Sequence, residues 1–205
     1  MKTTIYLIRH AESIANESGL YGGTTDYPLS KRGLAQAEAL ATRLSGIEFD
    51  AIYSSPLTRA KQTITPLAKN LGKEIIEEPN LKEIFVGEWE GIMWSELEIK
   101  YPKETRFIRE TEWHTGMKGQ EETDIVAKRM LEVITRISKE NPGKTIVATS
   151  HIQAIRAFLC ATQNVPYYKI KSKLGYIPNT GVTVLEYDSI TNKFTIKSSD
   201  QIALD

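Results

Sequence analysis

The sequence has one cysteine, no excess of either charge and no long apolar run. Cys160 cannot form a disulfide within the chain, and its apolar neighbours in AFLCA indicate a packing role on a helix. The 26 basic and 26 acidic residues leave no net field to attract nucleic acid or an anionic membrane. No stretch approaches the roughly 20 apolar residues of a membrane span, and MKTTIYLIRH is charged too early for a signal peptide. We therefore expect a cytoplasmic protein without nucleic-acid or membrane partners.

Common metal and nucleotide motifs are also missing. The three histidines and the cysteine show no HxxxH or CxxC spacing, so no metal site is expected. Neither a GxxxxGKS/T loop nor a GxGxxG turn occurs, which excludes these two nucleotide-binding loops. No cofactor is predicted, and any binding of an anion must depend on local cations.

Alternating strand and helix patterns predict one α/β domain over residues 1–205. Thr3–Ile8 is mostly β-branched or aromatic, which is typical of a buried strand, and Lys144–Thr149 repeats the pattern. The β-α-β-α order implies a three-layer α/β/α fold around a mostly parallel sheet. A terminal hairpin of residues 182–187 and 194–197 is expected at the sheet edge. Residues 92–120 are predicted to form a small helical and loop insertion that caps the site.

Local signals suggest how several segments fold. Residues 14–32 are rich in glycine and polar residues and are predicted to be a loop. Ser55–Pro56 predicts a helix start, with the hydroxyl as cap and proline at the first position, so that Arg59 lies in the first turn. Glu121–Glu140 is predicted to be an amphipathic helix with Ile125 on its apolar side.

Both predicted buried strands end on a histidine. His10 follows the first strand directly after Arg9, and His151 follows the second. Ligands of open α/β sheets bind at the carboxyl ends of strands, so we expect these side chains to share one site. A neutral imidazole can attack phosphorus, which makes His10 a candidate nucleophile with Arg9 and Arg59 as phosphate clamps. A cationic His151 would stabilise the transition state, and Glu83 would protonate the leaving group and then activate water.

Each of these residues also has an ordinary structural explanation. Arg59 alone fits an exposed helix residue, Glu83 a solvated acid, and His151 a buried histidine with satisfied hydrogen bonds. As a nucleophile, His10 would need its second ring nitrogen held by a hydrogen bond, which we expect from a backbone carbonyl. His114, within the predicted cap, fits a contact at the rim of the site.

The chain resembles the histidine phosphatase superfamily, also called phosphoglycerate-mutase-like proteins. The matching blocks are LIRHAESIAN (7–16), YSSPLTRAKQT (53–63), LKEIFVGEWEG (81–91), TSHIQAIRAFL (149–159) and, more weakly, YGGTTDYPLSKRG (21–33). The resemblance extends over nearly the whole chain and implies metal-free phosphoryl chemistry on a mostly parallel α/β sheet. The roles it implies are His10 as phosphorylated nucleophile, Glu83 as proton donor, Arg9, Arg59 and His151 as phosphate pocket, and Asn16, Gly22 and Gly23 as substrate contacts.

Two positions depart from the pattern of this family. Ala11 and Ile152 stand where the family usually has glycine after each histidine. A methyl group at Ala11 is tolerable if its φ stays negative. Ile152 is bulky, and with Gln153 it is expected to narrow the pocket, so Gln153 joins the predicted substrate contacts.

Within this family we favour a phosphomonoesterase that acts on a small phosphorylated substrate. A mutase must enclose a bisphosphate, whereas the insert between Glu83 and His151 is short. The cations that could hold a second anionic group are Lys100, Lys103, Arg106 and Arg109. The alternatives are a phosphoglycerate-type mutase and a catalytically silent phosphate-binding protein.

Two further features remain open at the level of sequence. Five aromatic residues of the loop and cap form either a rim around the substrate or ordinary packing: Phe85, Trp89, Trp94, Phe107 and Trp113. The terminal hairpin could pair with a second copy of the chain, which would give a homodimer.

Overall fold

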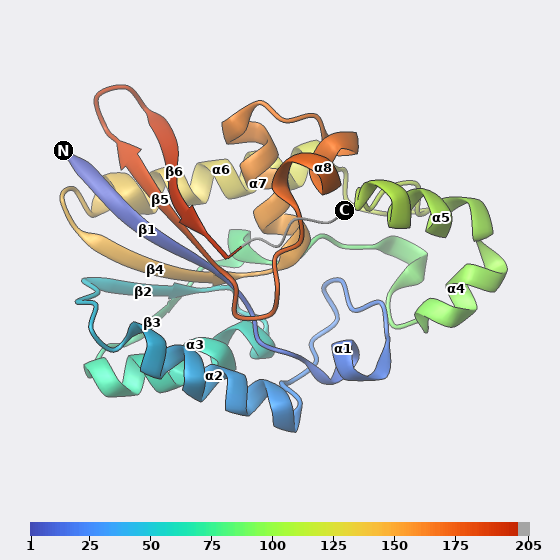
Figure 1. The fold of residues 1–205 in the computed structure, drawn as a ribbon, viewed down its shortest axis with the longest axis horizontal. Coiled ribbons are helices and arrows are strands. Elements are labelled where there is room, and N and C mark those ends of the chain that lie inside the picture. Colours follow the sequence, from blue (N-terminus) through green and yellow to red (C-terminus); the bar gives the residue numbers. More distant parts are fainter. Residues whose placement is uncertain (201–205) are drawn as a thin grey trace.

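The computed structural model describes residues 1–200, in which a six-stranded sheet of order β3-β2-β4-β1-β5-β6 forms the middle layer (Figure 1). The first four strands are mutually parallel, whereas β5 runs antiparallel to β1 and to β6. The mostly parallel sheet and the terminal hairpin at its edge are confirmed. The strands are β1 (Lys2–Arg9), β2 (Ala51–Ser54), β3 (Ile75–Glu77), β4 (Thr145–Ser150), β5 (Val182–Asp188) and β6 (Lys193–Ser199).

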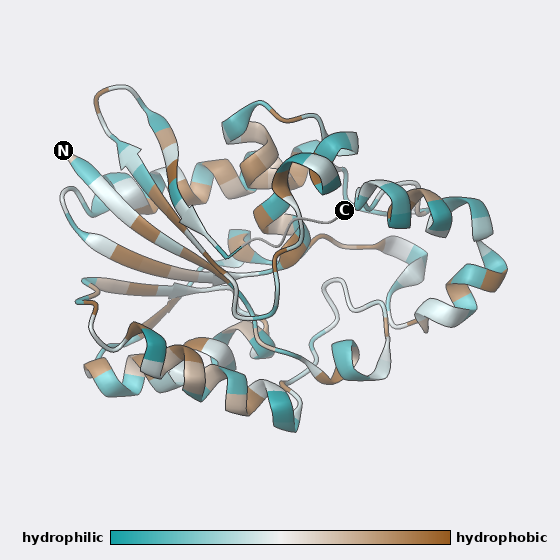
Figure 2. Ribbon diagram, viewed as in Figure 1, coloured by the Kyte–Doolittle hydropathy of each residue, from teal (hydrophilic) through white to brown (hydrophobic). Residues whose placement is uncertain are grey.

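Helices cover both faces of the sheet and complete the predicted three layers (Figure 1). Side chains of β1 alternate between the two faces: Ile5 and Leu7 join one apolar core, and Ile8 joins the other. Cys160 packs in the first of these cores, as predicted. Figure 2 shows apolar residues along the strands and on the helix faces turned toward them. On one face lie α2 (Lys31–Leu44) and α3 (Thr58–Leu71), and on the other α6 (Thr123–Glu140) and α7 (Ile152–Gln163).

Short helices lie beyond the carboxyl ends of the parallel strands (Figure 1). The predicted helical and loop insertion contains two helices, α4 (Trp94–Lys100) and α5 (Pro102–Thr111). Pro102 begins α5, a position where its missing N–H costs no helical hydrogen bond. The remaining short elements are α1 (Ile14–Ser18), α8 (Ile170–Leu174) and 3-10 turns at Pro79–Leu81, Gly87–Trp89 and Tyr167–Lys169.

The predicted start of the third helix was wrong. α3 begins at Thr58, and the Ser55 hydroxyl does not cap it. Asp26 takes this role instead, because its carboxylate accepts from the Thr58 backbone N–H and hydroxyl, each at 2.7 Å. The cap comes from a residue distant in sequence, which a local pattern cannot indicate. Arg59 still lies in the first turn, as expected.

Two other local predictions also need correction. The predicted loop of residues 14–32 contains α1, which begins with a reciprocal capping box between Ser13 and Asn16. Ile125 does not belong to the buried side of α6, since it is 56% exposed. It lies in the first turn of that helix.

Membrane-spanning helices and the number of domains are the remaining points about the fold. Among residues 1–200, no helix combines the length and the apolar character needed to cross a bilayer. The single domain over residues 1–205 stays a prediction, and its last five residues lie outside the described range.

The start of α2 packs closely against the segment that follows β1. Ser30 caps α2 through Gly33 N–H at 3.0 Å, and its own N–H donates to the Glu12 carbonyl at 2.9 Å. A Cβ at Gly33 would lie 1.9 Å from that carbonyl oxygen. Gly33 therefore allows the close approach that fixes the chain just beyond β1.

We predict that Gly33→Ala destabilises the protein by about 1–3 kcal/mol, because the methyl group overlaps the Glu12 carbonyl and forces the backbone apart. Gly46→Ala is the matched control, since nothing lies within 4 Å of its added Cβ and its φ is not positive. Urea unfolding of both variants measures the difference. Equal stability of the two variants would contradict the close packing described here.

Candidate active site

The parallel register of β1 and β4 brings the two predicted histidines together. Arg9 pairs with Ser150 at the ends of these strands, and His10 N–H donates to the Ser150 carbonyl at 3.0 Å. The rings of His10 and His151, one residue further along each strand, have centroids 5.1 Å apart. The expected meeting of the two strand ends is confirmed.

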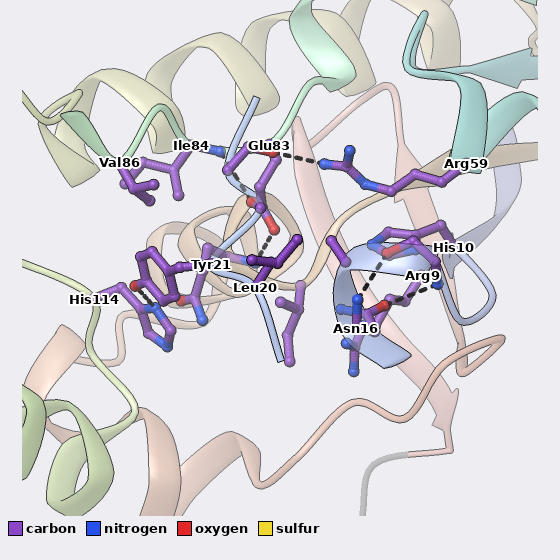
Figure 3. Close-up of a pocket in the computed structure, with 16 residues that line it drawn as sticks. Arg9, His10, Asn16, Leu20, Tyr21, Arg59, Glu83, Ile84, Val86 and His114 are labelled. Atoms are coloured by element: carbon purple, nitrogen blue, oxygen red, sulfur yellow. Dashed lines mark hydrogen bonds between the residues drawn. The ribbon is translucent and has the colours of Figure 1, made fainter. Parts of the chain in front are cut away.

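A cavity of about 160 Å³ opens at this edge of the sheet. It is lined by eight of the nine predicted site residues, and His151 lies fully buried beside His10. Figure 3 shows Arg9, His10 and Asn16 at one end of the cavity and Tyr21 and His114 at the other. The predicted residues that line it are Arg9, His10, Asn16, Gly22, Gly23, Arg59, Glu83 and Gln153.

His10 is a buried, neutral imidazole with one nitrogen fixed. Its Nδ1 lies 2.7 Å from the Ala11 carbonyl, which can only accept, so Nδ1 carries the proton and Nε2 has the free lone pair. Burial, followed by the charges of Arg59 and Arg9, holds the pKa of His10 well below its ordinary value. The expected hydrogen bond between the His10 ring and a backbone carbonyl is confirmed. Ala11 has no positive φ, as the methyl group requires.

The hydrogen bonds of His151 fit a neutral ring, whereas the cationic form considered above would need both ring nitrogens protonated. Its Nδ1 accepts from Arg59 Nε at 3.2 Å, so Nε2 carries the proton and donates to the Ser55 hydroxyl at 2.8 Å. Burial is the largest cause that lowers the pKa of His151 well below its ordinary value, and the Arg59 charge comes second. An imidazolium form would require Arg59 to release Nδ1.

Both arginines are buried and are held by backbone carbonyls. Arg59 donates to the carbonyls of Thr25 at 2.9 Å and Gly23 at 2.6 Å, so it is not the exposed helix residue of the ordinary explanation. Arg9 donates from one terminal nitrogen to the Ile177 carbonyl at 2.6 Å and the Tyr176 hydroxyl at 2.9 Å. Its buried Nε has no partner in the described chain. A buried donor of this kind is suited to an anionic oxygen.

Glu83 is buried at the N-terminus of α7 rather than solvated. Its carboxylate accepts from the backbone N–H of Ala154 at 2.9 Å, Ile84 at 3.0 Å and Gln153 at 3.2 Å. The positive end of the helix dipole favours a carboxylate at this position. Glu83 therefore has a fixed place on the cavity wall.

Residues 179–181, which were not predicted to belong to the site, hold the backbone of Arg9 and His10 by hydrogen bonds. Asn179 donates to the His10 carbonyl at 3.0 Å, and Thr180 N–H donates to the Arg9 carbonyl at 3.1 Å. Arg9 N–H in turn donates to the Gly181 carbonyl at 3.0 Å. The available signal was the turn sequence PNTG directly before β5, whose antiparallel pairing with β1 returns the chain to His10.

The basic and aromatic residues that were considered as contacts of the substrate do not line the cavity. Arg109 pairs with Glu98, and Arg106 pairs with Glu110 at 2.8 Å. None of the four cap cations or five aromatic residues named above lines the cavity. Trp89 is buried against Tyr101, so packing explains its presence. Within residues 1–200, no three His, Cys, Asp or Glu side chains gather in a metal-binding arrangement.

The model of the histidine phosphatase superfamily, branch 1, matches residues 5–199. The chain belongs to this superfamily. It is 36% identical to phosphoserine phosphatase 1 of Hydrogenobacter thermophilus over 168 residues, which cover 82% of this chain and 80% of that one. It is 34% identical to the metal-independent phosphoserine phosphatase of Arabidopsis thaliana, with 89% and 76% of the two chains covered.

A solved structure agrees with these sequence relatives. The phosphoserine phosphatase of Entamoeba histolytica, in complex with 3-phosphoglyceric acid, is 29% identical with a TM-score of 0.80. The match covers 98% of each chain. The predicted family and the expected enzyme class, a phosphatase of the histidine phosphatase type, are confirmed.

We predict that stability falls as the pH drops below about 6.5, the ordinary histidine pKa. The pKa values of His10, His151 and His114, the last at about 3, are lowered by burial, so the unfolded chain takes up protons that the folded chain excludes. Above this pH the histidines do not make the free energy of unfolding depend on pH. Below it, each histidine can lower that free energy by as much as about 1.4 kcal/mol per pH unit.

Urea unfolding at neutral pH and about one unit below the histidine pKa measures this loss. His114→Phe should show a shallower loss than the parent, because one of the three buried imidazoles no longer titrates. A stability that rises on acidification in this range would show that the histidines are not held neutral.

Proposed function

We propose that this phosphatase hydrolyses small phosphate monoesters through a phosphohistidine on His10. The observation that carries the proposal is the 2.7 Å hydrogen bond between His10 Nδ1 and the Ala11 carbonyl, which leaves the lone pair of a neutral ring on Nε2. A buried, neutral imidazole next to two buried guanidinium groups is suited to attack a bound phosphate dianion.

In the first step, His10 Nε2 attacks phosphorus and the bond from phosphorus to the ester oxygen breaks. Glu83 must carry a proton at that stage, which the nearby phosphate dianion favours by opposing a second negative charge. It donates this proton to the departing alkoxide, which leaves as an alcohol. Arg9 and Arg59 stabilise the charge on the equatorial oxygens, and His151 adds to this as an imidazolium once Arg59 has released its Nδ1. The unpartnered Nε of Arg9 is a ready donor for one of these oxygens.

In the second step, a water molecule attacks the phosphohistidine and the bond between nitrogen and phosphorus breaks. Glu83, now a carboxylate, accepts the proton of the water. Inorganic phosphate leaves, and His10 returns to its neutral form. Apart from His151, which lies buried beside His10, the residues that these steps use line the cavity.

The size of the cavity supports a small substrate. About 160 Å³ lies below the roughly 300–1,000 Å³ of typical ligand pockets. Asn16, Gly22, Gly23 and Gln153 would contact the substrate from its wall. Because the relatives described above are phosphoserine phosphatases, phosphoserine is the first substrate we would test.

The alternatives receive less support. The cap cations that could hold a second anionic group in a mutase do not line the cavity. A silent binding protein would not need Glu83 fixed by three backbone N–H groups opposite the phosphate site. The homodimer stays a prediction that rests on the edge position of β6.

We predict that His10→Ala loses phosphatase activity by about a thousandfold or more, because no other group replaces the nucleophile. Phosphate release from phosphoserine and p-nitrophenyl phosphate, with EDTA present, measures the effect. Turnover in the parent that resists EDTA and disappears in the variant would support metal-free chemistry through His10. Turnover retained in the variant would overturn the assignment.

We also predict that the loss in Glu83→Gln depends on the leaving group. Hydrolysis of phosphoserine should fall about 10²–10⁴-fold, since its alkoxide must be protonated as it departs. The p-nitrophenolate group is a weak base that needs no proton, so its ester should be affected much less in the first step. Glu74→Gln, at an exposed acid, is the matched control. Equal losses on both esters would remove Glu83 from the role of proton donor.

A further inference from the structure

The wall of the cavity contains a polar group that no contact within the described residues uses. Gln153 is only 9% exposed, and its side-chain Nε2 is buried without a partner in the described part of the chain. Its backbone N–H is already committed to Glu83 at 3.2 Å. A buried amide without a partner is costly, so it is kept where a ligand completes its hydrogen bonds.

The end of the cavity away from His10 contains a polar pair, Tyr21 and His114 (Figure 3). Their rings stack at 5.5 Å with an angle of 5°, and the Tyr21 hydroxyl is hydrogen-bonded to His114 Nδ1. Burial lowers the pKa of His114 to about 3 and raises the pKa of Tyr21 well above its ordinary value, so both are neutral. The phenol can donate to Nδ1, and the proton of the neutral imidazole then lies on Nε2, where it is a further donor.

The charges around this end favour a hydrogen-bond acceptor over a cation. Glu83 is the only acidic residue that lines the cavity within residues 1–200, and backbone N–H groups already surround its carboxylate. Apolar side chains also line the cavity, among them Leu20, Val86 and Ile152. A cationic leaving group would meet no free carboxylate here, whereas an anionic one would meet two neutral donors.

We propose that Gln153 Nε2 and His114 Nε2 form a subsite for a carboxylate on the leaving group of the substrate. The proposal rests on the proposed function, because it assumes that the phosphate lies at His10. A site built to hydrogen-bond a substrate group discriminates strongly against an analogue that lacks the group, since its buried donors are then left unpaired.

The test compares phosphoserine with phosphoethanolamine, which is the same ester without the carboxylate. We expect the kcat/KM of the parent enzyme to favour phosphoserine by about tenfold or more. Gln153→Met removes the donor with little change in length and adds no charge beside Glu83, and it should reduce this preference several-fold. Gln153→Glu, which sets a carboxylate against the substrate, should reduce it further. Gln163→Met, at the far end of α7, is the matched control and should keep the ratio of the parent.

Two results would overturn the subsite: no preference in the parent, or a preference that both Gln153 variants retain. Failure of the proposed function is a separate result, since neither ester nor p-nitrophenyl phosphate would then be hydrolysed. In that event, calorimetric binding of the two esters to the parent and to Gln153→Met gives the same comparison without turnover. Equal affinities of the parent for both esters would then overturn the proposal.

Discussion

The pairing of β1 with β4 is the constraint on which the site depends. These strands are 135 residues or more apart in sequence, yet their parallel register sets Arg9 beside Ser150 and therefore His10 beside His151. A shift of one residue would turn each side chain to the opposite face of the sheet, because side chains alternate along a strand. The buried residues of β1, which pack into a different core on each face, prevent such a shift.

Beyond the pairing of the strands, the main feature of the site is that its charged groups are buried away from water. Arg9, Arg59 and Glu83 are all buried, and backbone groups satisfy most of their hydrogen bonds. Interactions among charges are stronger there than in water, and groups that are already oriented need no rearrangement when a dianion arrives. The same burial keeps His10 neutral, which a nucleophile requires.

The fold and the main reactive side chains could be predicted from the sequence, because each depends on a short pattern. The strand at Thr3–Ile8 and the repeat at Lys144–Thr149 both end on a histidine, so the sheet edge and its two imidazoles could be predicted together. Contacts between distant segments could not. Asp26 caps α3 across 32 residues, which left Ser55 free to hold His151 instead. Glu83 likewise gains its place from α7, about 70 residues further along the chain, and no local pattern separates it from the acids nearby.

The PNTG turn has a consequence for the order in which the protein matures. Asn179, Thr180 and Gly181 hold the backbone of Arg9 and His10, although more than four-fifths of the chain separates the two segments. During synthesis, the first strand leaves the ribosome long before its supports exist. The phosphate pocket can therefore be completed only when the last strands have been made and docked, which places its assembly at the end of folding. A nascent chain that lacks the final hairpin would carry the nucleophile without the frame that orients it.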